Sequence, residues 1–180
     1  NLQTEQSHYL KNVMRCKINE KILVFDNNTG EYKAEIVNIH KRSIDIEILE
    51  KTKPRYVPGD VWLIFCPLKK TRSDFLIEKS TEIGLRKFLP TYSSKTQTKK
   101  VSLNRSRKNI VEAVEQCGGT FIPEILPISP LAEVIEELPE DRILIFCDES
   151  LESRNINECL LLDRPEKVAI LVGPEGGFSD

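Results

Sequence analysis

A glycine-rich turn near the end of the sequence is the first stretch that could do chemistry. The apolar run 168–172 is followed by Gly173, Pro174, Glu175, Gly176 and Gly177. A buried strand that runs into such a turn brings backbone amides and carbonyls close to a ligand. The turn matches neither G-x-G-x-x-G nor G-x-x-x-x-G-K-[ST], which disfavours dinucleotide binding and an NTPase. We expect either a flat, mostly uncharged ligand such as an adenosyl group, or an ordinary turn between a strand and a helix.

Positive charge gathers in one stretch of a chain whose net charge is only -2. Segment 95–108 contains no acid, and its basic residues are Lys95, Lys99, Lys100, Arg105, Arg107 and Lys108. Such a block indicates either an anionic partner, most commonly nucleic acid, or a solvated loop. Arg105 and Arg107 fall in the first turn of an expected helix, where the helix dipole favours anions. Arginines there are repelled by the positive end of the dipole, unless a bound phosphate balances the charge or the helix begins later in the sequence.

A second candidate site lies on an expected helix over residues 71–84. Glu78 and Glu82 are one turn apart, a spacing that can serve acid–base chemistry. Carboxylates at this spacing more often pair with lysines in solvent, and we favour that interpretation. Arg72 and Lys79 share a nearby face of the same helix, and Lys69 and Lys70 precede it.

The elements that must position these groups alternate between strand and helix from residue 61 onward. Apolar runs predict strands at 61–67, 87–92, 120–125, 142–148 and 167–173. Capping and stop residues predict helices at 71–84, 104–119 and 129–139, with Phe75, Leu76 and Ile83 buried on the first. This alternation predicts an α/β domain with a parallel sheet, whose ligands bind beyond the carboxyl ends of the strands. Phe146 and Cys147 lie at one such end, and the glycine turn lies at another.

The first fifty residues have a different pattern. Residues 21–39 read as a hairpin that turns at 27–30, and in 43–49 Ile44, Ile46 and Ile48 face one side. A short helix over 7–15 is expected to bury Leu10, Val13 and Met14. We therefore predict a small antiparallel sheet or barrel, joined by a Pro- and Gly-containing linker at 51–60 to a second domain.

Composition narrows the class of protein. The 180 residues are 39% hydrophobic, with no apolar run of the roughly 20 residues that a membrane helix needs and no visible secretion signal. The five cysteines form no CxxC pair, and His8 and His40 lie far from them, so we expect a reduced, cytoplasmic protein without a metal site. The first residue is Asn1, so we expect the N-terminus to be incomplete.

Four stretches in the same order resemble the ribosomal small-subunit methyltransferase E (RsmE) family of SPOUT-class enzymes. They are SHYLKNVMR (7–15), PLKKTRSDFLIEKSTEIGLRKFLP (67–90), EAVEQCGGTFIPEI (112–125) and ILVGPEGGFSD (170–180), and they span nearly the whole chain. The resemblance implies a PUA-like β-barrel at 1–55 that helps to bind RNA. It also implies a knotted α/β SPOUT domain at 60–180, S-adenosylmethionine as cofactor, a homodimer, and methylation of uridine N3 in 16S rRNA.

The resemblance also implies site residues. For the cofactor they are Phe146, Cys147, Val172, Gly173, Pro174, Glu175, Gly176 and Gly177. For RNA they are Arg15, Lys69, Lys70, Arg72 and Lys79, to which the basic segment adds Arg105 and Arg107. No catalytic base is assigned: Glu175 is the acid nearest the cofactor loop, but it could equally order the loop or balance the sulfonium charge. The alternative is a catalytically silent RNA-binding or ribosome-assembly protein of the same fold.

The sequence departs from the family pattern at two places, and each departure predicts a difference in binding. Gly119 stands where the family has Arg, so an RNA contact from that side chain is lost or moved. The family continues beyond the glycine turn with a last strand and helix, so we expect the C-terminus to be incomplete. We expect that a protein ending at Asp180 would bind the cofactor poorly and tend to aggregate. Its intact mass would distinguish it from a longer chain.

Overall fold

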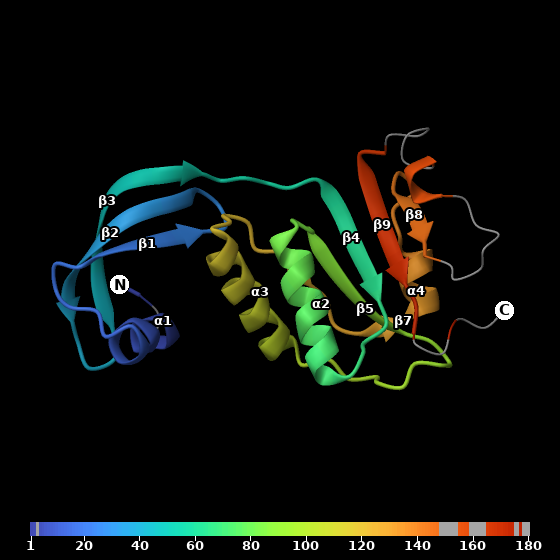
Figure 1. Ribbon diagram of the computed structural model, residues 1–180, viewed down its shortest axis with the longest axis horizontal. Coiled ribbons are helices and arrows are strands. Elements are labelled where there is room, and N and C mark those ends of the chain that lie inside the picture. The colour runs from blue at the N-terminus through green and yellow to red at the C-terminus, as the bar shows by residue number, and fades with distance from the viewer. Residues whose placement is uncertain (3, 148–154, 159–164, 175–176, 178–180) are drawn as a thin grey trace. The chain divides into compact units, whose positions relative to one another are not determined.

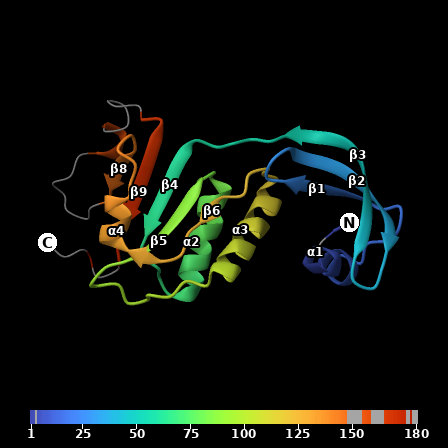
Figure 2. The ribbon, with the colours of Figure 1, turned by 180° about the vertical axis from the view of Figure 1, so that it is seen from behind.

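The computed structural model describes residues 1–2, 4–147, 155–158, 165–174 and 177. The chain forms two compact units, Asn1–Val57 and Pro58–Asp180, which Figures 1 and 2 show from opposite sides. Each unit is described by itself.

The first unit is an antiparallel sheet with two short helical segments before it. Helix α1 (Thr4–His8) continues into a π-helical turn, η1 (Tyr9–Val13), and strands β1 (Lys21–Asp26), β2 (Gly30–Ile39) and β3 (Ile44–Pro54) follow. The strand order is β1-β2-β3. The expected hairpin turn is confirmed: the Asp26 carboxylate accepts hydrogen bonds from the Asn28 amide (2.7 Å) and the Thr29 amide (2.6 Å). These bonds, with that from the Thr29 hydroxyl as the largest cause, lower the pKa of Asp26.

The core of the first unit is smaller than its apolar pattern predicts. Cys16, Ile36 and Ile44 are buried and Leu10 packs against them. Val13 and Met14, expected in the core, are 59% and 58% exposed. The Met14 amide donates to the Tyr9 carbonyl, and this wider π-helical turn changes the face on which the later side chains lie.

The third strand also departs from its predicted pattern. Ile44 is buried, but Ile48 on the same expected face is 51% exposed. The pairing of β2 with β3 shifts register after Ile48, between Lys33 and Ala34, so the alternation of faces along β3 is interrupted only beyond Ile48. The strand runs on to Pro54, so the first residues of the predicted linker belong to β3.

The second unit is built on a parallel sheet, which confirms the predicted α/β class. Its strands are β4 (Asp60–Phe65), β5 (Lys87–Tyr92), β6 (Glu124–Ile125), β8 (Ile143–Phe146) and β9 (Lys167–Val172), in the order β6-β5-β4-β9-β8. A short strand β7 (Ser129–Pro130) pairs with the end of β5. All the pairs are parallel, so the carboxyl ends meet at one edge.

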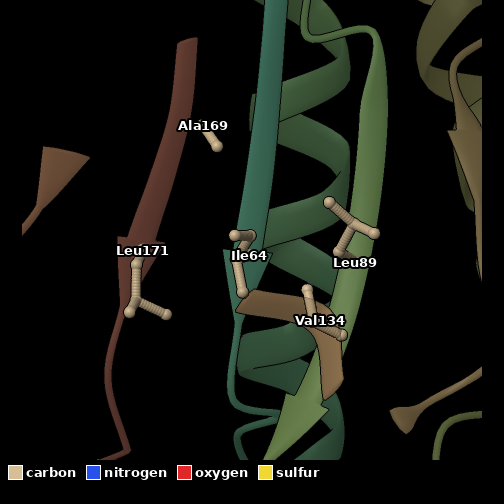
Figure 3. Packing of buried hydrophobic residues seen from close by; sticks show 5 residues of the cluster. All are labelled: Ile64, Leu89, Val134, Ala169 and Leu171. Atoms are coloured by element: carbon tan, nitrogen blue, oxygen red, sulfur yellow. The ribbon is translucent and has the colours of Figure 1, made fainter. Parts of the chain in front are cut away.

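The helices of this unit are α2 (Lys70–Glu82), α3 (Leu103–Cys117) and α4 (Leu131–Glu136). In Figure 3, Val134 of α4 lies in front of Ile64 of β4 and Leu89 of β5, with Ala169 and Leu171 of β9 beside them. These five side chains form one buried cluster. Helix α3 ends where Gly118 takes a left-handed φ of 64°, which confirms one of the two predicted stop residues.

Three predicted details of this unit are wrong. The strand expected at 120–125 is only Glu124–Ile125. The helix expected from Ser129 begins at Leu131, because Ser129 and Pro130 pair with Thr91 and Tyr92 of β5 instead. Phe75 and Ile83 of α2, expected in the core, are 62% and 79% exposed. Ile77, Ser80 and Thr81 are the buried residues of that helix.

We predict that limited proteolysis cuts first between residues 51 and 57. Every residue of that stretch is exposed, and the boundary between the two units follows it directly. Mass spectrometry of the fragments after brief trypsin treatment identifies the site. The bonds after Lys51 and Arg55 are available for cleavage, whereas the bond after Lys53 resists trypsin because Pro54 follows it. A first cut inside the parallel sheet would contradict the prediction.

Candidate functional site

The carboxyl ends of β4, β9 and β8 lie side by side at one edge of the parallel sheet. Phe146 at the end of β8 is in register with Leu171 of β9, and the Cys147 amide donates to the Leu171 carbonyl at 3.0 Å. The Cys66 amide, just after β4, donates to the Val172 carbonyl at 3.4 Å. The structure therefore brings the two predicted strand ends together.

The glycine turn begins where β9 ends. The Gly177 amide donates to the Pro174 carbonyl at 2.9 Å and closes the turn, and Gly177 has a φ of 70°. Glycine takes this left-handed conformation without strain, whereas a side chain with a Cβ does not. Glu175 and Gly176, two of the predicted cofactor residues, lie outside the described residues.

The side chains at this edge are apolar and partly exposed. Phe146 is 47% exposed and Val172 is 40% exposed, although both belong to strands of the central sheet. Pro174 is buried and Gly173 is half-buried. Apolar faces next to a turn that offers backbone donors and acceptors suit a flat, mostly uncharged ligand better than a phosphate group.

A buried polar cluster supports the same edge, and sequence reasoning missed it. The Thr96 hydroxyl donates to the Cys66 thiol sulfur (3.5 Å) and accepts from the Ser93 amide (2.8 Å). Thr91, which is fully buried, contacts the Cys66 sulfur from below at 3.9 Å. These contacts hold the loop after β5 against the end of β4.

A small pocket lies between the loops that follow β4, β5 and β9. Its lining residues are Pro67, Leu68, Lys69, Lys95, Gln97, Thr98 and Pro174. Three separate segments meet here. The sequence indicated Lys69, Pro174 and the basic residues 95–108 separately, but not that they lie together.

The predicted RNA residues of α2 lie along a shallow groove. Arg72 and Lys79 line it together with the apolar Phe75, Leu76 and Ile83. Lys69 immediately precedes the helix, and Lys70 is its first residue, with a side chain outside the described ones.

Acidic neighbours hold Lys79. Its ammonium group lies 2.8 Å from carboxylate oxygens of both Glu78 and Glu82. Hydrogen bonds to these two acids raise the pKa of Lys79. The prediction that the two glutamates pair with a lysine is therefore confirmed.

The structure gives Arg105 a protein partner. Helix α3 begins at Leu103, so the alternative of a later start is wrong and Arg105 does lie in the first turn. Its guanidinium binds both carboxylate oxygens of Asp74 on α2, to which the Asn109 amide also donates at 3.0 Å. Hydrogen bonds to Asp74 raise the pKa of Arg105. The cation in the first turn is thus balanced by Asp74 without a phosphate.

The remaining predicted RNA residues are exposed and lie in different units. Arg107 is on α3 in the second unit. Arg15 follows η1 in the first unit and has a positive φ of 56°. Among the described residues, no three His, Cys, Asp or Glu side chains gather as metal ligands, and no helix is long and apolar enough to cross a membrane.

The parallel sheet with its glycine turn is an α/β domain that follows a small antiparallel unit, and comparison with known families gives the class of protein. Residues 55–180 match the family described as the RNA methyltransferase domain, and residues 2–49 match the RNA methyltransferase PUA domain. The chain belongs to this RNA methyltransferase family.

Individual relatives narrow the family further. The chain is 31% identical over 188 residues to Ribosomal RNA small subunit methyltransferase E of Buchnera aphidicola subsp. Schizaphis graminum, covering 99% of this chain and 74% of the relative. It is 26% identical to the enzyme of the same name from Rickettsia conorii, covering 96% of this chain and 70% of the relative.

A solved structure agrees with these relatives. The crystal structure of Ribosomal RNA small subunit methyltransferase E from Neisseria gonorrhoeae, bound to S-adenosyl methionine, superposes with a TM-score of 0.88 at 26% identity. The match covers 99% of this chain and 75% of that one. The predicted resemblance and the predicted PUA-like and SPOUT-type α/β fold are confirmed.

Proposed function

We propose that this protein transfers a methyl group from S-adenosylmethionine to N3 of a uridine in the 16S rRNA of the small ribosomal subunit. The observation that carries the proposal is the partly exposed apolar edge at the ends of β8 and β9, next to the turn closed by Gly177. Two observations on relatives support the proposal. The relatives are named ribosomal RNA small subunit methyltransferases, and the structure of one such protein was solved with S-adenosyl methionine bound.

The residues present fit this cofactor. An adenine ring needs apolar faces and backbone hydrogen bonds at its edge, and the site offers Phe146 and Val172 together with the backbone of Gly173, Pro174 and Gly177. The bound cofactor supplies an electrophilic methyl group on a sulfonium sulfur. Phe146, Cys147, Val172, Gly173, Pro174 and Gly177 would hold it, with Glu175 and Gly176 completing the turn.

The protein's own contribution is to present the uridine and remove a proton. Uracil N3 becomes a good nucleophile only when its proton leaves, so a base or a water relay must stand beside it. The N3 edge normally pairs, so the nucleotide must be unpaired or turned out of its helix. Rigid strands on both sides of the site limit motion of the reacting groups, which lowers the entropic barrier. Glu175 remains our candidate for the base, with loop ordering as its alternative role.

We propose that both units bind the RNA. The first unit, residues 1–55, has the PUA-like fold and contributes Arg15. The second, residues 60–180, contributes Lys69, Lys70, Arg72, Lys79, Arg105 and Arg107. Arg105 and Lys79 already bind acidic side chains, so they would contact phosphate with part of their hydrogen-bonding capacity.

Charge reversal tests this assignment. Replacing Arg15, Arg72 or Lys79 with Glu is expected to weaken binding of 16S rRNA and to reduce the slope of log affinity against log salt by about 0.7–0.9 per lost phosphate contact. Cofactor affinity should not change. Lys167→Glu is the control, since Lys167 pairs with Asp141 at the start of β9, at the opposite edge of the sheet. A large loss of cofactor affinity in the test variants would show that these residues are placed wrongly.

We further propose that the protein is a homodimer that acts in the cytoplasm. The dimer is what the resemblance to this methyltransferase family implies, and closed symmetric homo-oligomers are the commonest assemblies of soluble proteins. The four cysteines of the described residues, Cys16, Cys66, Cys117 and Cys147, are free thiols, as expected in a reducing compartment. Light scattering measures the dimer directly, and a monomeric mass at micromolar concentration would contradict it.

Titration of the full-length protein with S-adenosylmethionine tests the enzymatic proposal against the silent alternative. A methyltransferase binds the cofactor in a calorimetric titration, with one site per chain expected. A protein that binds 16S rRNA but shows no heat with the cofactor would be an RNA-binding or assembly protein of the same fold.

A further inference from the structure

The pocket between the loops after β4, β5 and β9 differs in chemistry from the apolar edge beside it. Pro174 belongs to both regions, so the two adjoin. The pocket has room for roughly one water-sized group. An atom group of that size is an oxygen of a larger ligand, because a nucleobase or an adenosine would not fit.

The polar side chains that line the pocket can all donate hydrogen bonds. They are the ammonium groups of Lys69 and Lys95, the amide of Gln97 and the hydroxyl of Thr98, and no acid is among the lining residues that the structure describes. Helix α2 begins at Lys70, directly after the lining Lys69, and its first turn, residues 70–73, contains no acid. Two cations and the positive end of a helix dipole together favour a negatively charged oxygen.

The loop that supplies Lys95, Gln97 and Thr98 is held in place by its own side chains. The Thr96 amide donates to the Ser93 carbonyl at 3.3 Å, and the Thr96 hydroxyl accepts from the Ser93 amide at 2.8 Å. Thr96 is only 5% exposed because its hydroxyl points to the Cys66 sulfur under the loop. The donors therefore stand on a preorganised turn, which reduces the entropy lost on binding.

We propose that this pocket binds a phosphodiester oxygen of the RNA, at a nucleotide next to the one that receives the methyl group. This inference rests on the proposed function and adds Lys95, Gln97 and Thr98 to the RNA-contacting residues, with Thr96 as a positioning residue. RNA is favoured because Lys69 and Lys95 are exposed and Lys69 is followed closely by Lys70 and Arg72, two of the residues proposed to bind RNA. Phosphate bound here fixes the register of the RNA against the glycine turn.

The test compares three variants of the full-length protein. Lys95→Gln removes a charge from the pocket, Thr96→Val releases the loop, and Lys100→Gln removes the same charge from the same segment outside the pocket. Fluorescence anisotropy with a labelled 16S rRNA fragment gives RNA affinity at several salt concentrations, and calorimetry gives cofactor affinity. Lys95→Gln is expected to bind RNA about tenfold more weakly and to lower the salt slope by about 0.7–0.9.

The variants Lys100→Gln and Thr96→Val have different expected effects on RNA affinity. Lys100→Gln should change RNA affinity by less than about twofold, because an exposed charge outside a built site contributes little. Thr96→Val should weaken RNA binding as Lys95→Gln does, and unlike a purely structural residue it should also lower the salt slope. Lys95→Gln and Lys100→Gln should bind S-adenosylmethionine as the unaltered protein does.

Three results would overturn the proposal. Equal RNA affinities for Lys95→Gln and Lys100→Gln, in a protein whose unaltered form still methylates rRNA, would remove the phosphate site and leave the proposed function intact. A loss of cofactor affinity with unchanged RNA binding would assign the pocket to the methionine carboxylate of the cofactor instead. If the unaltered protein bound no 16S rRNA fragment, both the phosphate site and the proposed function would fail.

Discussion

Replacing Arg142 with alanine is expected to lower the free energy of unfolding of the second unit by about 3–5 kcal/mol. Arg142 lies just before β8, and its side chain is only 2% exposed. One guanidinium nitrogen donates to the carbonyls of Asp60 (2.9 Å) and Val168 (3.0 Å), and the other lies 3.0 Å from the Asp60 carboxylate. A single side chain thus joins the amino-terminal ends of β4, β9 and β8.

The alanine variant leaves charged and polar groups without their partner. Asp60 would retain Arg86 at 3.2 Å, but the two carbonyls would lose their shared donor. The Trp62 ring would also lose the guanidinium that lies 3.6 Å from its centre. Trp62 is the single tryptophan of the sequence, so its fluorescence during urea unfolding reports on this unit.

A matched control is available at the same edge of the sheet. Lys167→Ala breaks the more exposed ion pair with Asp141 and should cost no more than about 1 kcal/mol. Equal losses for Arg142→Ala and Lys167→Ala would contradict the role assigned to Arg142.

The same network predicts a dependence on pH. Burial by itself raises the pKa of Asp60, but the hydrogen bond and charge of Arg142, with that of Arg86, outweigh it and hold this pKa below its ordinary value of 3.8. The folded-state pKa is lowered, so the stabilisation is fully present above 3.8 and is lost as the pH falls through the lower folded value. The stability difference between the unaltered protein and Arg142→Ala should therefore narrow in that acidic range.

Gly177→Val is expected to weaken S-adenosylmethionine binding by about tenfold, since left-handed backbone costs a residue with a Cβ roughly 1–2 kcal/mol. The Cβ itself would meet no atom of the described residues within 4 Å, so the penalty comes from the φ of 70°. The turn would relax away from the ends of β8 and β9, where the cofactor's adenosyl group is proposed to lie. Calorimetric titration with the cofactor measures the change.

Gly177→Asn is the matched control for this prediction. Asparagine tolerates the left-handed conformation better than other residues with side chains, so its cofactor affinity should stay within about twofold of the unaltered protein. RNA affinity should be unchanged in both variants. Equal cofactor affinities for the valine and asparagine variants would show that the turn's conformation does not matter for binding.

The parallel sheet and the meeting of its strand ends could be predicted from the sequence. Apolar runs such as 168–172 and the stop at Gly118 are local signals, and carboxyl ends of parallel strands must share an edge. That rule places Phe146, Cys147 and Val172 at the same edge of the sheet, whereas the direct pairing of β8 with β9 was not predicted.

Features that depend on packing between distant segments could not be predicted. The apolar residues of the predicted helix suggest a buried face with Phe75 and Ile83. The helix instead buries Ser80 and Thr81. The Thr81 hydroxyl donates to the Ile77 carbonyl at 2.7 Å. A hydroxyl that bonds to a carbonyl of its own helix can be buried, but hydropathy does not reveal this because the residue still counts as polar. Arg142 and Asp60 are 82 residues apart, and the pocket with Lys95 and Pro174 draws on three loops. No periodicity in the sequence encodes such contacts.

Analysis of methylated nucleosides tests the central claim most directly. The full-length protein is incubated with S-adenosylmethionine and with small ribosomal subunits, or their 16S rRNA, that lack the modification. The rRNA is then digested to nucleosides and examined by mass spectrometry against standards of each methylated uridine. The account predicts 3-methyluridine that appears only when protein and cofactor are both present. No methylated nucleoside from a protein that binds both partners, or a methyl group on another atom or base, would contradict it.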